Sequence, residues 1–138
     1  MADPAYFKLF LKIIAVLFFF VGALHLTLGL QADQLLGAQV SLQTLSDPGL
    51  QSQNRFFGVS LTFYGAVFWL AANDLARHAL VLRLAITFIF VAALARFVAV
   101  ALFGWPPLLV GVLFGAEIVL PPVALIWLRA LPKAALDH

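Results

Sequence analysis

The stretch HALVLRLAITFIFVAALARFVAVALF, residues 78–103, decides the fold of this chain. Apart from His78 and Arg83 near its start and Arg96 in its second half, the stretch is almost entirely apolar, and Gly104 follows it. A helix of about 20 apolar residues spans the roughly 30 Å hydrocarbon core of a bilayer, because each residue adds about 1.5 Å. We therefore predict a transmembrane helix here.

Three more apolar stretches surround this one, over residues 6–30, 52–72 and 107–129. The 138-residue chain is 64% hydrophobic and only 10% charged, with a mean hydropathy of +1.09. Soluble domains carry about 25% charged residues, which excludes that class. Four spans use almost the whole chain. We predict one all-α domain over residues 1–138, an integral membrane four-helix bundle whose last three helices are antiparallel neighbours because short turns join them.

Basic residues are concentrated on one side of the predicted bundle. By the positive-inside rule, the side richer in lysine and arginine is cytoplasmic. We therefore predict a multi-pass protein of the inner (plasma) membrane with both termini cytoplasmic, and a lipid bilayer as its surroundings. The residues on the basic side are Lys8, Lys12, Arg77, Arg83, Arg129 and Lys133.

Each predicted helix carries one ionisable side chain inside or at the edge of its apolar stretch: His25, Arg55, Arg96 and Glu117. A charged group at the bilayer centre costs about 2.5–3.5 kcal/mol on insertion scales, so such residues usually face a bundle interior and mark a site. Helical rise counted from the basic side brings His25 and Arg96 to one level, about 20 Å into the membrane. We predict that the four groups form one polar column in the outer half.

Small residues lie beside these polar groups at helical spacing. Gly22 precedes His25, and Gly58 and Gly65 follow Arg55 by one and three helical turns. Small residues let membrane helices approach closely, so this pattern predicts the faces along which the helices pack.

The fourth helix adds two further features. Pro121 has no N–H to bond the carbonyl of Glu117, and an acid beside an unpaired carbonyl is typical of the lining of a polar cavity. Gly111 and Gly115 form a small-xxx-small pattern, and Gly115 is turned about 200° from Glu117. These glycines favour a homodimer contact or, equally, packing within one chain.

The connection at residues 31–51 combines spaced leucines with Asp33 and a turn beginning at Asp47. It favours a loop or short interfacial helix over the bundle mouth. Arg55 lies at its end, where it could meet a ligand, reach lipid head groups or cap the loop through Asp33 or Asp47.

The other polar groups also have structural alternatives. Arg96 and Glu117 could form an ion pair that only holds two helices in register. His25 alone is more often a hydrogen-bonded packing residue than a catalyst. These structural roles remain open as alternatives to a ligand site.

Several classes of function are excluded or disfavoured. The chain has no cysteine, which excludes thiolate-held metal centres and disulfides. Only His78 and His138 accompany His25, so we expect no metal site and no cofactor. The basic residues are dispersed rather than clustered, so we expect no nucleic-acid partner.

The sequence resembles a known family. The residues that carry the resemblance are QNRFFG at 53–58, Asp47 before it, the stretch from His25 to Asp33, Ala95-Arg96 ahead of Gly104-Trp105-Pro106, and Glu117 ahead of Pro121. In these motifs the chain is similar to a bacterial family of small four-helix membrane proteins catalogued only as a domain of unknown function. That family resembles DoxX-like proteins distantly, some of which are membrane subunits of quinone-linked oxidoreductases. The resemblance implies a bacterial inner membrane.

We therefore expect a module that binds a quinone or lipid. Its ligand-binding residues would be His25, Arg55, Tyr64, Arg96 and Glu117, with Phe18, Tyr64 and Trp69 flanking the apolar part. Two alternatives remain. The protein could be an accessory subunit of a larger membrane complex, or an enzyme that modifies a lipid through proton transfer by Glu117 and His25. Binding without turnover is the expectation we favour.

Overall fold

The computed structural model describes residues 3–132, and these form helices joined by short turns. The chain is all-α, as predicted. The elements in order are α1 (Pro4–Leu28), α2 (Leu30–Leu35), α3 (Leu42–Leu45), α4 (Pro48–Asn73), α5 (Leu75–Phe103) and α6 (Leu108–Ala130).

Three of the four long helices begin at an aspartate whose carboxylate accepts a backbone N–H of the first turn. Asp3 caps α1, Asp47 caps α4 through the N–H of Leu50 at 2.9 Å, and Asp74 caps α5 through the N–H of Arg77 at 3.0 Å. A cap of this kind is worth about 1 kcal/mol. As a result α4 and α5 start four and three residues earlier than the predicted residues 52 and 78, and the long connection shortens accordingly.

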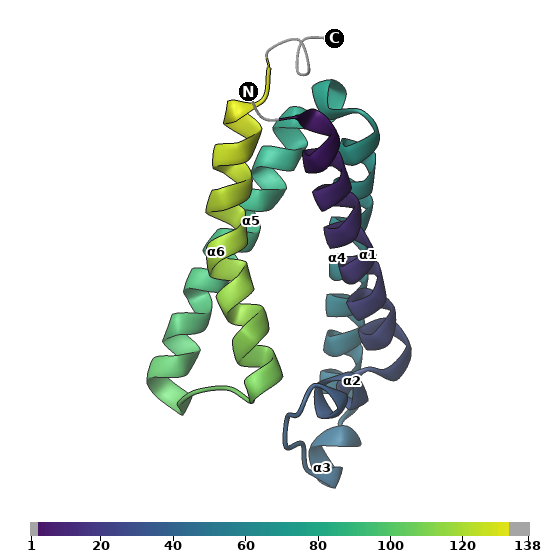
Figure 1. Ribbon diagram of the computed structural model, residues 1–138. Coiled ribbons are helices and arrows are strands. Elements are labelled where there is room, and N and C mark those ends of the chain that lie inside the picture. Colours follow the sequence, from purple (N-terminus) through teal and green to yellow (C-terminus); the bar gives the residue numbers. More distant parts are fainter. Residues whose placement is uncertain (1–2, 133–138) are drawn as a thin grey trace.

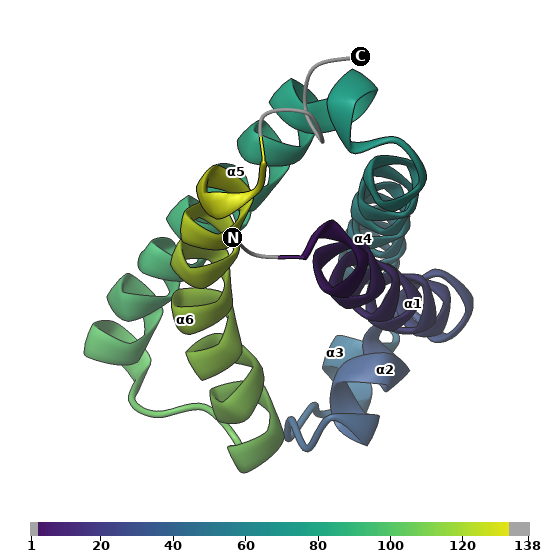
Figure 2. The same ribbon diagram turned by 45° about the horizontal axis from the view of Figure 1, so that its top comes forward.

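The helices are arranged as two pairs, α1 with α4 and α5 with α6, which join at the end where α1 begins and α6 ends and separate toward the end that holds α2 and α3 (Figures 1 and 2). We call these the termini end and the loop end. α4 and α5 run antiparallel and are joined by the single residue Asp74, which caps both. The predicted antiparallel order of neighbours is confirmed.

Glycines set the close approach of α1 and α4. A Cβ placed on Gly58 would lie 2.5 Å from the backbone nitrogen of Leu26 and 2.8 Å from the carbonyl oxygen of Gly22. A Cβ on Gly65 would lie 2.9 Å from the ring of Phe19. Any larger side chain would push the two helices apart, so the predicted packing face of small residues is confirmed for this pair.

The closest packing lies at the termini end. All of the largest fully buried side chains, Phe7, Leu11, Leu75, Leu82 and Leu128, belong to one core cluster there. The ring of Phe7 on α1 also meets that of Trp127 on α6, with ring centroids 5.3 Å apart. This contact fixes α1 against α6 at the termini end.

The four long helices are each long and apolar enough to cross a membrane. Their outer faces carry large apolar side chains, such as Phe103 at 87% and Leu102 at 69% exposed. Apolar surface on this scale is compatible with lipid but not with water. The protein is therefore a multi-pass membrane protein with four spans.

The connection between α1 and α4 folds back over the loop end. Gly29 ends α1 with φ +60°, a left-handed conformation that only glycine adopts readily, and the chain turns directly into α2. α2 and α3 are short helices, which is one of the two alternatives predicted from the spaced leucines of residues 31–51. A Cβ on Gly37, between them, would lie 3.4 Å from Pro107 at the start of α6, so this segment reaches across to the second helix pair.

Candidate functional site

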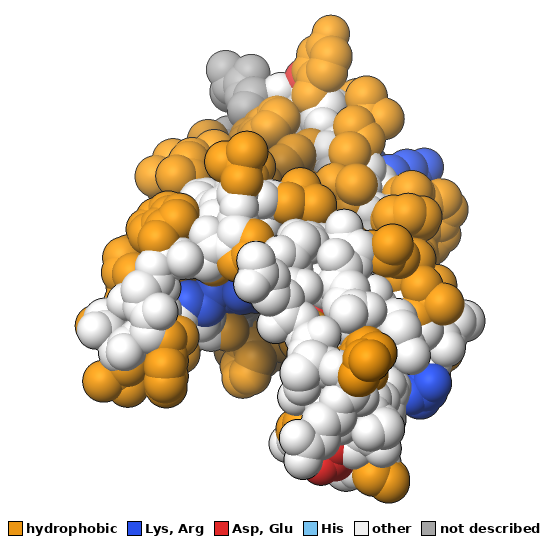
Figure 3. All heavy atoms as spheres, turned by 90° about the horizontal axis from the view of Figure 1, so that it is seen from below, with side chains coloured by type: hydrophobic (Ala, Val, Ile, Leu, Met, Phe, Trp, Pro, Cys, Tyr) orange, Lys and Arg blue, Asp and Glu red, His pale blue; other side chains and the backbone are white. Residues whose placement is uncertain are grey.

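A cavity of about 340 Å³ lies between the two helix pairs. Seen from the loop end, the molecule is hollowed between the pairs, and basic side-chain atoms appear at the wall of the hollow (Figure 3). The lining is mostly apolar and comes from all four long helices and α2. Its members include Phe10, Ile14, Phe18, Val21, Phe57, Leu61, Phe68, Ile86, Ile89, Val110, Leu113, Ala116, Leu120, Pro121 and Ala124, together with the polar residues His25, Asp33, Arg96 and Glu117.

Arg96 on α5 and Glu117 on α6 form a two-point ion pair in this wall. Arg96 Nε lies 2.8 Å from Glu117 Oε2, and Nη2 donates to Oε1 at 3.3 Å. Their antiparallel helices bring these two side chains within reach of each other. The side chains are 40% and 30% exposed, so the pair is open to the cavity and not sealed between helices.

His25 on α1 faces the same cavity and is 2% exposed. Its Nδ1 lies 2.8 Å from the carbonyl oxygen of Val21, which can only accept, so Nδ1 carries a hydrogen and donates. Nε2 is therefore the ring nitrogen directed to Asp33, 3.5 Å from Oδ1. The backbone bond fixes the ring, so the imidazole presents one defined edge to the site.

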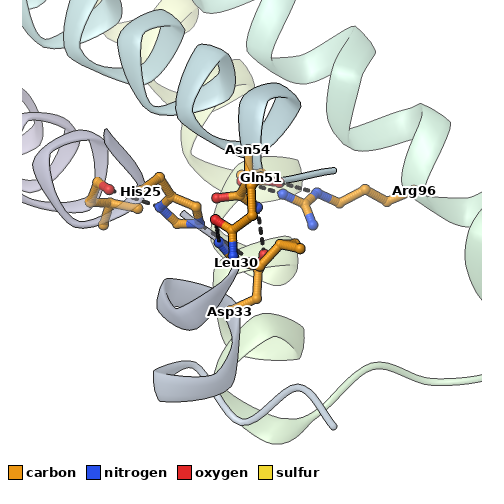
Figure 4. A network of polar contacts seen from close by, with 8 residues as sticks. His25, Leu30, Asp33, Gln51, Asn54 and Arg96 are labelled. Carbon is orange, nitrogen blue, oxygen red and sulfur yellow. Dashed lines mark hydrogen bonds and ion pairs between the residues drawn. The ribbon is translucent and has the colours of Figure 1, made fainter. Parts of the chain in front are cut away.

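Asp33 on α2 connects three elements. Besides the contact with His25, its Oδ2 accepts a hydrogen bond of 2.6 Å from Nδ2 of Asn54 on α4. Figure 4 shows His25, Asp33, Asn54 and Arg96 directed toward one region from four different elements. The Oδ1 of Asn54 is buried and has no hydrogen-bond donor among residues 3–132. Asp33 thus ties α2 to both helices of the first pair.

The position of Arg55 differs from the expectation. It does not line the cavity; its Nη1 donates to Oε1 of Gln51 at 2.6 Å, beside Gly29. Gln51 also accepts from the N–H of Leu30 at 3.3 Å and donates to the carbonyl of Leu45 at 2.8 Å. Arg55 therefore supports the packing of α2 and α3 on α4. Among residues 3–132, Arg55 pairs with neither Asp33 nor Asp47, and it does not share the cavity lining with His25, Arg96 and Glu117.

The predicted aromatic flank is only partly in the cavity. Phe18 lines it, and Tyr64 packs behind Phe18 with ring centroids 5.8 Å apart and against Phe88 at 6.1 Å, outside the lining. Trp69 lies away from it, and the Nζ of Lys12 sits 5.7 Å from its ring centroid.

On α6, Pro121 and Glu117 both line the cavity, as the proline pattern indicated. The helix continues through Pro121 and Pro122 to Ala130. Gly111 packs within the chain, since a Cβ there would lie 3.0 Å from the indole nitrogen of Trp105. Gly115 is exposed with nothing within 4 Å, and a homodimer through these glycines stays a prediction.

Asp33 is the site residue that the sequence did not assign. Its signal was indirect: this acid follows Gly29 by four residues and His25 by eight, so little chain separates it from the imidazole. Within residues 3–132 no cluster of three His, Asp or Glu side chains could hold a metal ion.

These features define a four-span membrane bundle with an amphipathic cavity between two helix pairs. The chain matches the family described as "Domain of unknown function (DUF4345)" over residues 6–128, and it belongs to that family. No curated protein and no solved structure is significantly similar to it.

Proposed function

We propose that this protein binds a hydrophobic or amphipathic small molecule, a quinone or a lipid, in the cavity between the two helix pairs. The observation that carries the proposal is the combination, in one cavity of about 340 Å³, of a largely apolar wall with Arg96, Glu117, His25 and Asp33. Small-molecule sites typically measure about 300–1,000 Å³ and combine an apolar lining with a few placed polar groups.

Three of the five residues expected to contact the ligand have this role in the proposal: His25, Arg96 and Glu117. Arg55 and Tyr64 lie outside the lining. Arg55 acts on the site by supporting the packing of α2, and Tyr64 acts on it by packing against Phe18. The contact between Phe7 and Trp127 closes the cavity at the termini end. The ligand therefore enters from the bilayer between α1 and α6, where the two helix pairs diverge.

The same proposal includes the membrane and the orientation. The basic residues at the termini end favour both termini on the cytoplasmic side of a bacterial inner membrane, which places the polar groups of the cavity in the outer leaflet. The distant likeness to DoxX-like proteins supports a quinone among the ligands but does not fix one.

A lipid-modifying enzyme is the second candidate. One observation favours it: the imidazole of His25 and the carboxylate of Glu117, which do not pair with each other, line the same cavity. Chemical change in a retained molecule on incubation would distinguish this candidate from a binder.

The proposal is tested by native mass spectrometry of the protein in mild detergent, followed by extraction and identification of retained molecules. Ala116→Phe places a ring in the cavity beside the ion pair, whereas Val119→Phe places the same ring on the lipid-facing side of the same helix, where Val119 is 57% exposed. We expect a defined bound mass on the wild type and on Val119→Phe, and its loss from Ala116→Phe.

Two results would contradict the proposal. One is equal retention by all three proteins, which would place the bound molecules on the outer surface. The other is a folded wild type that retains nothing and also takes up none of the amphiphiles offered to it. The latter would favour an accessory subunit, whose ion pair serves only to join α5 and α6.

A further inference from the structure

The two charged side chains Arg96 and Glu117 compensate each other in the wall of the cavity. Both oxygens of Glu117 are engaged by Arg96, through Nε at 2.8 Å and Nη2 at 3.3 Å. Oδ2 of Asp33 accepts a hydrogen bond of 2.6 Å from Asn54, and its Oδ1 lies 3.5 Å from Nε2 of His25. Arg96 and Glu117 thus form a pair that is neutral as a unit, so this pair offers no counter-ion to a charged ligand.

Hydrogen-bonding capacity nevertheless remains. Nη1 of Arg96 has no acceptor among residues 3–132, and the guanidinium is 40% exposed. The oxygens of Glu117 have further lone pairs that face the cavity, because a carboxylate can accept about four hydrogen bonds. The wall can thus donate one hydrogen bond and accept another without any change in its charge.

We propose that the head group that meets the Arg96–Glu117 pair in this cavity is uncharged and carries a carbonyl or hydroxyl, as in a prenyl quinone or an acylglycerol, and is not the head of a fatty acid, an anionic phospholipid or an amine. This inference rests on the proposed function. In a low-dielectric site a charge without a partner is strongly disfavoured, whereas a neutral carbonyl needs only the donor on Arg96.

The apolar part of the ligand then runs toward the termini end. Seven residues separate Glu117 from Ala124, a helical rise of about 10 Å, and fifteen separate His25 from Phe10, about 22 Å. The wall between these levels is formed by rings and branched side chains, including Ile14, Phe18 and Ile86. An apolar chain of about 10–20 Å fits this length.

The test uses four probes with a common ten-carbon tail: a decyl-substituted benzoquinone, monodecanoylglycerol, decanoate and decylamine. Each is titrated against the purified protein and its bound fraction is measured by native mass spectrometry. For the wild type we expect the two neutral probes to bind about ten-fold or more tighter than decanoate or decylamine. The neutral probe that binds more tightly shows whether the head group is that of a quinone or that of an acylglycerol.

Two single variants each leave one uncompensated charge at the position of the ion pair, positive in one variant and negative in the other. Glu117→Gln leaves Arg96 without its counter-ion, so decanoate should gain about ten-fold and become the preferred probe. Arg96→Gln leaves Glu117 unpaired, so decylamine should gain instead. The double variant Arg96→Gln/Glu117→Gln restores neutrality and should prefer neutral probes again, which controls for damage to the fold.

A wild type that prefers decanoate or decylamine would overturn the neutral head group, as would an unchanged order of affinities in both single variants. These results leave the cavity as a binding site. Failure of all four probes to bind the folded wild type would overturn the proposed function itself, so the two failures are distinguishable.

Discussion

Individual residues show how far the site could be predicted. Arg96 and Glu117 were predicted to meet because both lie on long helices, where depth follows from counting residues. The contact between His25 and Asp33 was not predicted, because Asp33 follows the left-handed turn at Gly29, and the direction of the chain after such a turn is not encoded by any periodicity. Arg55 was misplaced because its nearest partner, Gln51, was assigned to a loop.

At the scale of one residue, Gly58→Ala should destabilise the protein by about 2 kcal/mol, because the added methyl would lie 2.5 Å from the backbone of α1 and the helices must move apart. The measurement is the thermal unfolding midpoint in detergent, followed by tryptophan fluorescence, and we expect it to fall by about 7 °C.

Gly115→Ala is the matched control, since it adds the same methyl to a helix with nothing within 4 Å. Its midpoint should stay unchanged or rise slightly, because alanine favours a helix more than glycine does. Equal destabilisation of both variants would show that the close approach at Gly58 is not what holds α1 and α4 together.

Whole elements were predicted more securely than their ends. The four apolar stretches fix the spans, but α4 and α5 begin earlier than expected because Asp47 and Asp74 cap them. An aspartate immediately before proline, as at Asp47, is a sequence signal for a helix start. α2 is too short to be stable by itself, so its position depends on Asp33, Gln51 and the packing around Gly29.

Asp33→Ala should therefore loosen α2 without changing the four spans. It removes the hydrogen bond from Asn54 and the contact with His25, and a hydrogen bond to a charged group is worth about 1.5–3 kcal/mol. We expect amide exchange over residues 31–37 to accelerate about ten-fold, measured by hydrogen–deuterium exchange with mass spectrometry.

Gln34→Ala serves as the comparison, because this neighbouring side chain bonds only the carbonyl of Val40. Its exchange should remain close to that of the wild type over the same residues. If both variants exchange alike, Asp33 does not hold α2 over the cavity.

The arrangement of the whole molecule was the part least accessible from sequence. Apolar faces are similar on all four helices, so hydropathy does not say which helices pair closely or that the two pairs diverge. The pairing depends on local features: glycines at the contact of α1 and α4, and Phe7 against Trp127 at the termini end. The divergence that results gives a bundle of 138 residues room for a ligand-sized cavity.

The central claim is that an amphiphile lies between the helix pairs, and photo-cross-linking tests it most directly. A neutral decyl-tailed probe with a diazirine in its tail is bound to the protein, illuminated and mapped by peptide mass spectrometry. The account predicts labels on cavity-lining segments of α1 and α6, within residues 10–21 and 113–124, that excess unlabelled probe removes. Labels confined to outward-facing residues such as Val98 and Leu102, and unaffected by the competitor, would contradict it.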